Sequence, residues 1–236
     1  KNRFKKEKLI MNKKKEVFII IIATVLTFGV PIQTWADSND SLVSNDVVFF
    51  DERDFEGIVE QILNIKSEHP EWMEQQVEDA MDVNAPGKSA MRSGIIDIWN
   101  SLTDSEKKLV IRYPFDALKV NQAKNIATTQ TETKFGVNGL GNKSDAFRHG
   151  IWNAEMTYLI GKTKAELFAT AHEDKDVSGK ESDGFLKTEH KNMDLHNNEV
   201  GRILAMQNPG LTEDAVANLI YSEVNKEKSS FIWLHE

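Results

Sequence analysis

The stretch SDAFRHGIWNAEMTYLIG at residues 144–161 decides the predicted fold and the candidate site. It predicts one amphipathic helix, because Ser144 suits the N-cap, Asp145 lies in the first turn and Gly161 suits the C′ position. Five side chains recur at spacings of three and four residues and share one face: Asp145, His149, Trp152, Asn153 and Met156. Buried polar groups are costly unless they have partners. This face therefore predicts either a functional site or a buried hydrogen-bond network.

Apolar residues at helical spacing continue on both sides of this stretch. Upstream they predict five helices and a polar linker, over residues 54–65, 71–81, 90–102, 107–112, 115–127 and 128–133. Downstream they predict helices over residues 163–173, 189–206 and 211–224. Two capping-box patterns, Thr103 with Glu106 and Thr163 with Glu166, mark helix starts. No stretch alternates with period two, so we predict an all-α fold, a single multi-helix domain of eight or nine helices.

The N-terminal part has the features of a secretory signal peptide. Lysines 13–15 are followed by an apolar run of fourteen residues, Val17–Val30, and by small residues at Thr34 and Ala36, which suit cleavage after Ala36. The apolar run is shorter than a membrane-spanning helix needs, although an uncleaved anchor is the alternative. We expect a secreted, extracellular protein with no stable membrane span after cleavage. The expected segments are an upstream extension (1–10), the signal peptide (11–36), a flexible leader (37–53), a helical supporting region (54–130), a site-bearing helical domain (131–226) and a C-terminal tail (227–236).

Removal of the signal peptide makes the chain strongly acidic. Residues 1–36 hold eight basic and two acidic residues, so residues 37–236 hold 21 basic and 35 acidic residues, a formal net charge of −14. Nucleic acid and anionic membranes repel such a surface, and we expect no nucleic-acid partner. The sequence contains no Cys, which excludes disulfides and a thiol nucleophile. The domain must therefore depend on its core or on a bound metal.

Two later segments, FATAHED at 168–174 and MDLHNN at 193–198, can supply partners for the polar face. The three segments together offer seven candidate catalytic residues: His149, Asn153, His172, Glu173, Asp194, His196 and Asn197. Asp145 and Arg148 are candidate substrate-binding residues. On a regular helix His196 points about 160–200° away from Asp194. Both can serve one site only if the helix begins near them or is distorted there.

Two chemistries fit these residues. In the first, a divalent metal such as zinc or calcium keeps an open position for water, Glu173 is the general base, and the ligands are drawn from His149, His172, Asp194 and His196. In the second, no metal is present and Asp194 orients a histidine that acts as general base or acid. Asn153 and Asn197 then hold the polar group of the substrate. The non-catalytic alternative is a buried hydrogen-bond network that only fixes helix packing.

Two loops partly match ligand-binding motifs. Residues 174–185 begin like an EF-hand calcium loop, but Phe185 stands where a bidentate glutamate is needed, so a solvated loop or a flap is the alternative. The glycine-rich residues 136–144 resemble a phosphate loop, but Asn142 separates the last glycine from the lysine, which breaks the Walker pattern. With Arg148 nearby, this loop and the following helix N-terminus can still hold an anionic group.

Three motifs occur in order along the chain: DAFRHGIWNAEM at 145–156, FATAHED at 168–174 and MDLHNNEVGR at 193–202. Together they resemble an uncharacterised family of helical domains in secreted and toxin-like bacterial proteins, over about residues 102–224. The family's function is unknown, so the resemblance implies no catalytic assignment. It implies only that the motif positions are held by Asp145, His149, Asn153, His172, Glu173, Asp194, His196 and Asn197.

We expect a secreted helical hydrolase that cleaves an ester or phosphoester in an envelope or lipid substrate. A toxin-like effector role is compatible with this activity. The alternative is a secreted, non-catalytic module that binds a protein partner. The two hypotheses differ in whether the three polar segments meet at one water-accessible hollow.

Overall fold

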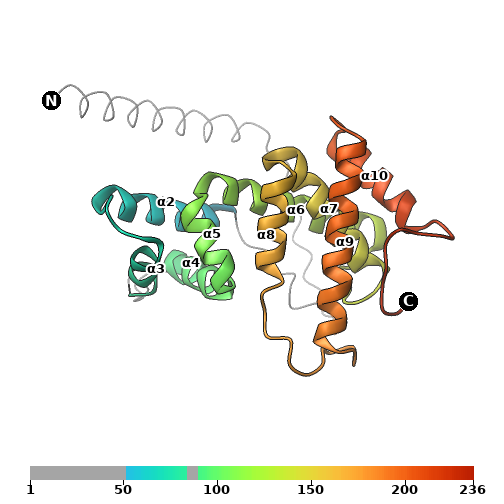
Figure 1. Ribbon diagram of the computed structural model, residues 1–236, viewed down its shortest axis with the longest axis horizontal. Coiled ribbons are helices and arrows are strands. Elements are labelled where there is room, and N and C mark those ends of the chain that lie inside the picture. The colour runs from blue at the N-terminus through green and yellow to red at the C-terminus, as the bar shows by residue number, and fades with distance from the viewer. Residues whose placement is uncertain (1–51, 84–89) are drawn as a thin grey trace. The chain divides into compact units, whose positions relative to one another are not determined.

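The structure, a computed structural model, describes residues 52–83 and 90–236. Within these residues it contains nine α-helices and no β-strand, which confirms the expected all-α fold (Figure 1). The expected upstream extension, the signal peptide and most of the leader lie outside the described residues. In chain order the helices are α2 (Glu52–Glu68), α3 (Glu74–Val83), α4 (Ala90–Ser101), α5 (Asp104–Arg112), α6 (Pro114–Phe135), α7 (Lys143–Ile160), α8 (Lys162–His172), α9 (Lys187–Gln207) and α10 (Glu213–Val224).

Helix α7 packs against α6, α8, α9 and α10 and is the central helix of the described part of the chain (Figure 1). Every residue from Ser144 to Thr157 is buried. The expected amphipathic helix is therefore buried all round, because neighbours cover it on several sides instead of one core face. Its polar side chains must consequently find partners inside the protein. None of the described helices is long and apolar enough to cross a membrane.

Local contacts set both ends of α7. Asn142, and not the expected Ser144, is the N-cap, because Asn142 Oδ1 accepts the backbone N–H of Ser144 at 3.0 Å. At the other end Gly161 adopts φ 84° and ψ 152°, which suits a residue without Cβ and lets α8 begin one residue later. The expected capping box of Thr163 and Glu166 is therefore wrong, since Gly161 is the N-cap of α8.

Two expectations for the helices before α7 have opposite outcomes. The capping box is confirmed at the start of α5, where Thr103 Oγ1 accepts the Glu106 N–H at 3.0 Å and Glu106 Oε2 accepts the Thr103 N–H at 2.8 Å. The linker expected over residues 128–133 is wrong, because α6 runs unbroken for 22 residues. The hydroxyls of Thr128 and Thr131 donate to carbonyls four residues earlier, at 3.0 and 2.7 Å, so these polar residues are satisfied within the helix.

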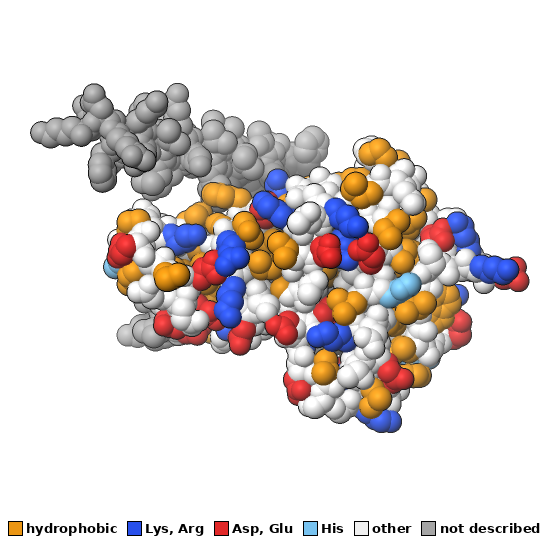
Figure 2. Space-filling model, in the orientation of Figure 1, with side chains coloured by type: hydrophobic (Ala, Val, Ile, Leu, Met, Phe, Trp, Pro, Cys, Tyr) orange, Lys and Arg blue, Asp and Glu red, His pale blue; other side chains and the backbone are white. Residues whose placement is uncertain are grey.

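The helices before α6 extend the same hydrophobic core. Helix α2 buries Ile58, Val59 and Ile62 and packs against α4 and α6. These apolar residues follow the helical spacing seen in the sequence, which is why α2 forms where it was expected. On the face of the molecule in Figure 2, acidic and basic side chains are interspersed among exposed apolar ones.

Helices α7 and α9 approach closely at two glycines. A Cβ atom on Gly201 of α9 would lie 2.2 Å from the carbonyl oxygen of Gly150 in α7. A Cβ atom on Gly150 would lie 2.5 Å from the Phe231 ring. Neither position has room for a methyl group. The missing side chain of Gly201 lets the two backbones meet, and that of Gly150 leaves room for the Phe231 ring. This approach brings polar side chains of α7 and α9 within hydrogen-bonding reach.

We expect Gly201→Ala to lower the free energy of unfolding by about 1–3 kcal/mol, because its methyl group must displace the α7 backbone. This loss exceeds the roughly 1 kcal/mol that alanine gains over glycine as a helix former. Urea unfolding followed by circular dichroism measures the change. Ile203→Ala, at an exposed position of α9, is the control and should shift stability by no more than about 0.5 kcal/mol. A Gly201→Ala protein as stable as the parent would show that the close approach is dispensable.

Glu155 of α7 is a buried acid on another side of the helix. Burial raises the pKa of Glu155 to about 7, and the negative charge of Glu213 at the start of α10 adds to the rise. The folded protein therefore keeps this proton up to about pH 7, whereas an unfolded chain releases it near pH 4.5. Since the folded state binds more protons between these values, this residue makes stability fall as the pH rises from about 4.5 to about 7.

Glu155→Gln should remove this pH dependence. At pH 8 we expect the variant to unfold with a free energy about 1–3 kcal/mol higher than the parent, because no charge is then buried. At pH 4, where both proteins hold a neutral group, the difference should disappear. Thermal and urea unfolding across this pH range provide the measurement, with Glu166→Gln at an exposed position of α8 as the control. A gain that is independent of pH would contradict the assignment.

Candidate functional site

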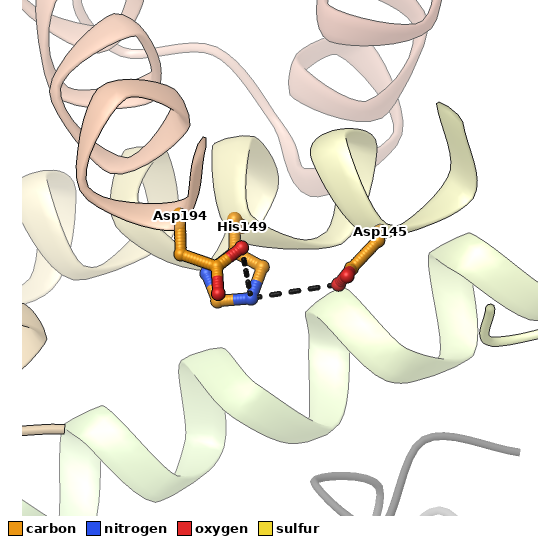
Figure 3. A group of neighbouring side chains, drawn as sticks. All are labelled: Asp145, His149 and Asp194. Carbon is orange, nitrogen blue, oxygen red and sulfur yellow. Dashed lines mark ion pairs between the residues drawn. The ribbon is translucent and has the colours of Figure 1, made fainter. Parts of the chain in front are cut away.

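Three titratable side chains from α7 and α9 meet in the interior (Figure 3). His149 Nε2 lies 3.5 Å from Asp145 Oδ1 and 3.3 Å from Asp194 Oδ1. One ligand atom from each residue can be chosen so that all three lie within 4.8 Å of one another. The three residues, called the Asp–His–Asp cluster below, are only 1–7% exposed, so water and salt screen their charges weakly.

A relay of hydrogen bonds fixes the orientation of the His149 ring. Arg202 has donors only, so its Nη1, 2.6 Å away, must face the amide oxygen of Asn153. Asn153 Nδ2 then donates to Asn198 Oδ1 at 2.6 Å. Asn198 Oδ1 also lies 3.1 Å from His149 Nδ1 and accepts the proton of that nitrogen. The neutral ring thus carries its proton on Nδ1 and a lone pair on Nε2.

This lone pair faces the two carboxylates of the cluster. Burial lowers the pKa of His149, and the neighbouring Arg148 and His172 side chains lower it further. These effects outweigh the carboxylates of Asp145 and Glu173, so the ring is neutral at neutral pH. The Arg148 guanidinium offsets the charge of Asp145, and a cation between the lone pair and the two carboxylates would reduce the remaining repulsion. One imidazole nitrogen and two carboxylate oxygens form a ligand set that suits zinc, manganese or a similar divalent ion.

Asp145 is held in the cluster by two donors. Arg148 Nη2 donates to Asp145 Oδ1, and the Gly141 N–H donates to Oδ2 at 2.7 Å. Outer hydrogen bonds of this kind orient the carboxylates that bind metals. Asp145, expected to bind substrate, is thus a cluster residue. The loop of residues 136–142, expected to hold a substrate anion, instead supports this carboxylate through Gly141.

Glu173, at the end of α8, is a third acid beside the cluster. Its Oε1 lies 3.9 Å from His149 Nδ1, which is too far for a hydrogen bond. The residue is 5% exposed, and Oε1 has no hydrogen-bond partner. Glu173 lines a hollow together with His190 and Asp194, next to the loop that connects α8 to α9. We call this space the loop-side hollow.

A second hollow adjoins His149 between α6, α7 and α8. It is lined by Lys124, Arg148, His149, Trp152 and His172, with Ala127 and Thr128. This space, called the α6-side hollow below, is narrow and has room for a small group beside the imidazole. The cluster is therefore buried but borders two spaces that reach the surface.

His172 lies at the α6-side hollow but faces away from the carboxylates of the cluster. Its Nδ1 is 2.9 Å from Glu106 Oε1, and its ring centroid lies 5.2 Å from that of Trp152. Burial would raise the pKa of Glu106, but the contacts with His172 and with the Thr103 N–H outweigh burial and lower it. His172 is thus paired with an acid of α5, and the structure does not place it among the expected metal ligands.

A comparison with protein families matches residues 107–228 to a domain of unknown function (DUF6973). The match covers more than half of the chain. The chain belongs to the DUF6973 family. Its matched part contains the whole Asp–His–Asp cluster and the relay that orients it. Comparisons with curated proteins and with solved structures find no match.

His196 and Asn197 of this DUF6973 domain hold the C-terminal tail instead of joining the cluster. His196 Nε2 lies 2.7 Å from the Ser230 carbonyl oxygen. Asn197 Nδ2 donates to the Ile232 carbonyl at 2.9 Å, and Asn197 Oδ1 accepts the Ile232 N–H at 3.0 Å. Helical rotation explains His196, which lies two positions and about 200° after Asp194 on α9. Asn197, three positions after Asp194, lies nearer to that face but turns to the tail. The expected roles of His196 as a metal ligand and of Asn197 in substrate binding are corrected accordingly.

Asn153 and the acidic loop after α8 also have partners other than the expected ones. The amide of Asn153, expected to hold the substrate, is engaged by Arg202 and Asn198. In the loop expected as a calcium site, Asp174 accepts from Ser105 and Asp176 accepts from Ser178, so these two carboxylates serve separate partners.

Three residues that sequence reasoning left out belong to the surroundings of the cluster: His190, Asn198 and Arg202. The spacing of four residues from His190 to Asp194, from Asp194 to Asn198 and from Asn198 to Arg202 is a signal that places all of them on one side of α9. That side, and not the one bearing His196, faces α7.

Asn197→Ala should loosen the tail without changing the cluster. We expect the free energy of unfolding to fall by about 1–3 kcal/mol, because two backbone groups lose a buried partner. Release of the tail should also shift the fluorescence of Trp233 toward that of a solvated indole. Asn192→Ala, at an exposed position of α9, is the control for both readouts. A variant of unchanged stability and fluorescence would contradict the anchoring role.

Proposed function

We propose that this DUF6973 protein is a divalent-cation-dependent hydrolase that cleaves phosphoesters. Asp145, His149 and Asp194 are the cation ligands. The observation that carries the proposal is the buried His149 Nε2 lone pair aimed at two carboxylates. Leaving three electron-rich groups together in the interior is costly, and a cation removes that cost.

The surroundings of the ligands favour this interpretation. His149 donates its second ring proton to Asn198 Oδ1 at 3.1 Å, and Asp145 accepts from the Gly141 N–H at 2.7 Å. Metal-binding histidines and carboxylates usually have such outer partners, which set their direction before the ion arrives. A cation bound here would lower the pKa of a bound water and polarise an ester bond. The chain's own contribution is to hold the three ligand atoms within 4.8 Å of one another.

The charge of the α6-side hollow supports a phosphoester over a neutral ester. Lys124, Arg148 and His172 all line it, beside His149. Arginine and lysine are the side chains best suited to phosphate oxygens. Arg148 also contacts the cluster through Asp145, so one guanidinium can link the substrate anion to the cation ligands. The hollow is narrow, so we expect only phosphoryl oxygens to approach these side chains while the remainder of the substrate stays outside it.

The place of action is part of the proposal. The apolar run and small residues within residues 11–36 support export, and an envelope or lipid phosphoester is then an accessible substrate. The alternative, a non-catalytic module, has the same relay of Arg202, Asn153 and Asn198 as a purely structural network. The two proposals differ in cation binding, which the network alone does not require.

Cation binding is the decisive experiment. Isothermal titration with Mn²⁺ and Zn²⁺ should show one site per chain in the wild type, and His149→Ala and Asp194→Asn should weaken it by about 100-fold or more, since each removes one of three ligands. Hydrolysis of bis(p-nitrophenyl) phosphate should fall in parallel and should be abolished by a chelator. His196→Ala is the matched control, because His196 lies on α9 like Asp194 but outside the cluster. This variant should bind the cation as the wild type does.

Two results would overturn this function. A folded wild-type protein that binds neither cation would leave the cluster as a structural network. Cation binding that survives both His149→Ala and Asp194→Asn would move the site elsewhere. Circular dichroism of each variant shows whether a loss reflects the site or the fold.

A further inference from the structure

Asp183 and His190 form a second buried acid–histidine pair beside the cluster. His190, in the first part of α9, places Nε2 at 3.1 Å from Asp183 Oδ1 and 3.0 Å from Oδ2. Burial would raise the pKa of Asp183, but its contacts with His190 and with the Phe185 N–H lower it, so it is a carboxylate. A carboxylate only accepts hydrogen bonds, and His190 Nε2 therefore carries the proton.

The other nitrogen of His190 is then a buried acceptor. In the neutral ring a proton on Nε2 leaves a lone pair on Nδ1. His190 is 5% exposed, and its Nδ1 has no hydrogen-bond partner in the protein. A buried acceptor without a partner costs about 1–3 kcal/mol. Such a cost is expected where the partner is a water or a ligand group.

The pair is built against the same structural elements as the cluster. His190 and Asp194 lie four residues apart on α9, so they are neighbours on one face. Both line the loop-side hollow with Glu173, whose Oε1 is a second buried acceptor without a partner. Gly141 touches both groups: its N–H binds Asp145, and a Cβ atom on it would lie 2.8 Å from His190 Cε1. One glycine thus separates the pair from the cluster.

We propose that His190 is a catalytic proton acceptor of this site and that Asp183 is its positioning residue. This inference rests on the proposed hydrolase function. A water in the loop-side hollow gives a proton to His190 Nδ1 while its oxygen bonds to the phosphorus. The bond from phosphorus to the leaving oxygen breaks with its electron pair, and that oxygen takes up the proton from the imidazolium or from solvent. Asp183 stabilises the imidazolium and fixes which nitrogen faces the hollow.

The C-terminal tail places a second histidine against Asp183. His235 of the tail also contacts Asp183, with Nε2 at 3.3 Å from Oδ2, and its Nε2 lies 2.9 Å from the Leu140 carbonyl oxygen. Asp183 thus has a second histidine partner that ties the loop to the tail. His235, in contrast to His190, does not line the loop-side hollow. His235 therefore provides a matched control for the loss of one histidine from the same acid.

The experiment compares His190→Ala, His190→Gln and Asp183→Asn with His235→Ala in the full chain. Each variant is assayed with Mn²⁺ for cation affinity and for hydrolysis of bis(p-nitrophenyl) phosphate. We expect both His190 variants to bind Mn²⁺ within about threefold of the wild type and to hydrolyse the diester about 100-fold more slowly or worse, the usual effect of losing a general base. Added imidazole should restore at least about tenfold to His190→Ala, because it can occupy the vacated space.

The nitrogen that carries the proton is measured separately from activity. Long-range ¹H–¹⁵N NMR should show His190 protonated on Nε2 in the wild type, and this preference should be lost in Asp183→Asn. His235→Ala should keep the proton of His190 on Nε2. Its hydrolysis rate should stay within about threefold of the wild type. If His190→Ala does not fold, the hydrolysis rate of His190→Gln and the NMR measurement still test whether His190 is the proton acceptor.

Three outcomes overturn the proposal. A His190 variant that hydrolyses at the wild-type rate would exclude His190 as the proton acceptor. The proposed hydrolase function would remain, because cation binding and hydrolysis then persist. A slow His190→Ala that imidazole does not rescue assigns the pair a structural role, as does a proton on Nδ1. A wild type that binds no cation and cleaves no diester overturns the hydrolase function and this inference together, and is recognised because the defect is already present before any substitution.

Discussion

The site depends on one asymmetry, that a guanidinium can donate hydrogen bonds but cannot accept them. Glu199 holds Arg202 with contacts of 3.0 and 2.6 Å, and Arg202 in turn presents a donor to Asn153. From that point each amide in the relay has one permitted orientation, because an oxygen must meet a hydrogen at every step. The last step is His149, whose proton is forced onto Nδ1. A charge pair at the far end of α9 thus determines which histidine nitrogen faces the two acids.

This relay requires the close contact of α7 with α9. Asn153 and Asn198 belong to different helices, and their 2.6 Å hydrogen bond forms only where the backbones come together at Gly150 and Gly201. The burial of residues 144–157 of α7 depends partly on this contact, because α9 is one of the four helices that cover it. Once α9 lies against it, polar residues of α7 have no access to solvent and must be satisfied by the facing helix. Packing and chemistry are therefore set by the same contact, and neither glycine belongs to the site itself.

The sequence predicted the helices well because their apolar spacing is regular, and it predicted the polar face of α7 because Asp145, His149 and Asn153 are spaced by four residues. It could not choose among the neighbouring polar residues of MDLHNN. Asp194 and Asn198 face α7, whereas His196 and Asn197 face the tail, and this choice depends on how α9 is rotated about its axis. That rotation is fixed by contacts between distant segments, which the sequence of one helix does not contain.

The other wrong predictions have both local and long-range causes. The threonines of α6 suggested a linker, but their hydroxyls bond within the helix, so polarity there did not indicate a break. His172 stands beside Glu173 in the sequence, yet it turns to Glu106 on α5 while Glu173 turns to the cluster. The spacing of His190 from Asp194 places it on the same side of α9, but its pairing with Asp183 could not be predicted, because Asp183 belongs to an irregular loop without periodicity. Side-chain pairs between a helix and a loop are the part of this site that pattern analysis does not reach.

The loop-side hollow contains acceptors without protein partners, which a structural network does not explain. Lys124 and Arg148 line the α6-side hollow, whereas the loop-side hollow is lined by three lysines and by the acceptors on Glu173 and His190. His149 and Asp194 of the cluster each border one of these spaces. A phosphoryl transfer needs an anion held by positive charge and a water held by acceptors, with the attacking and leaving oxygens roughly in line through phosphorus. Under the proposed function, cationic side chains beside His149 hold the anion and the acceptors of the loop-side hollow hold the water, whereas helix packing alone requires neither.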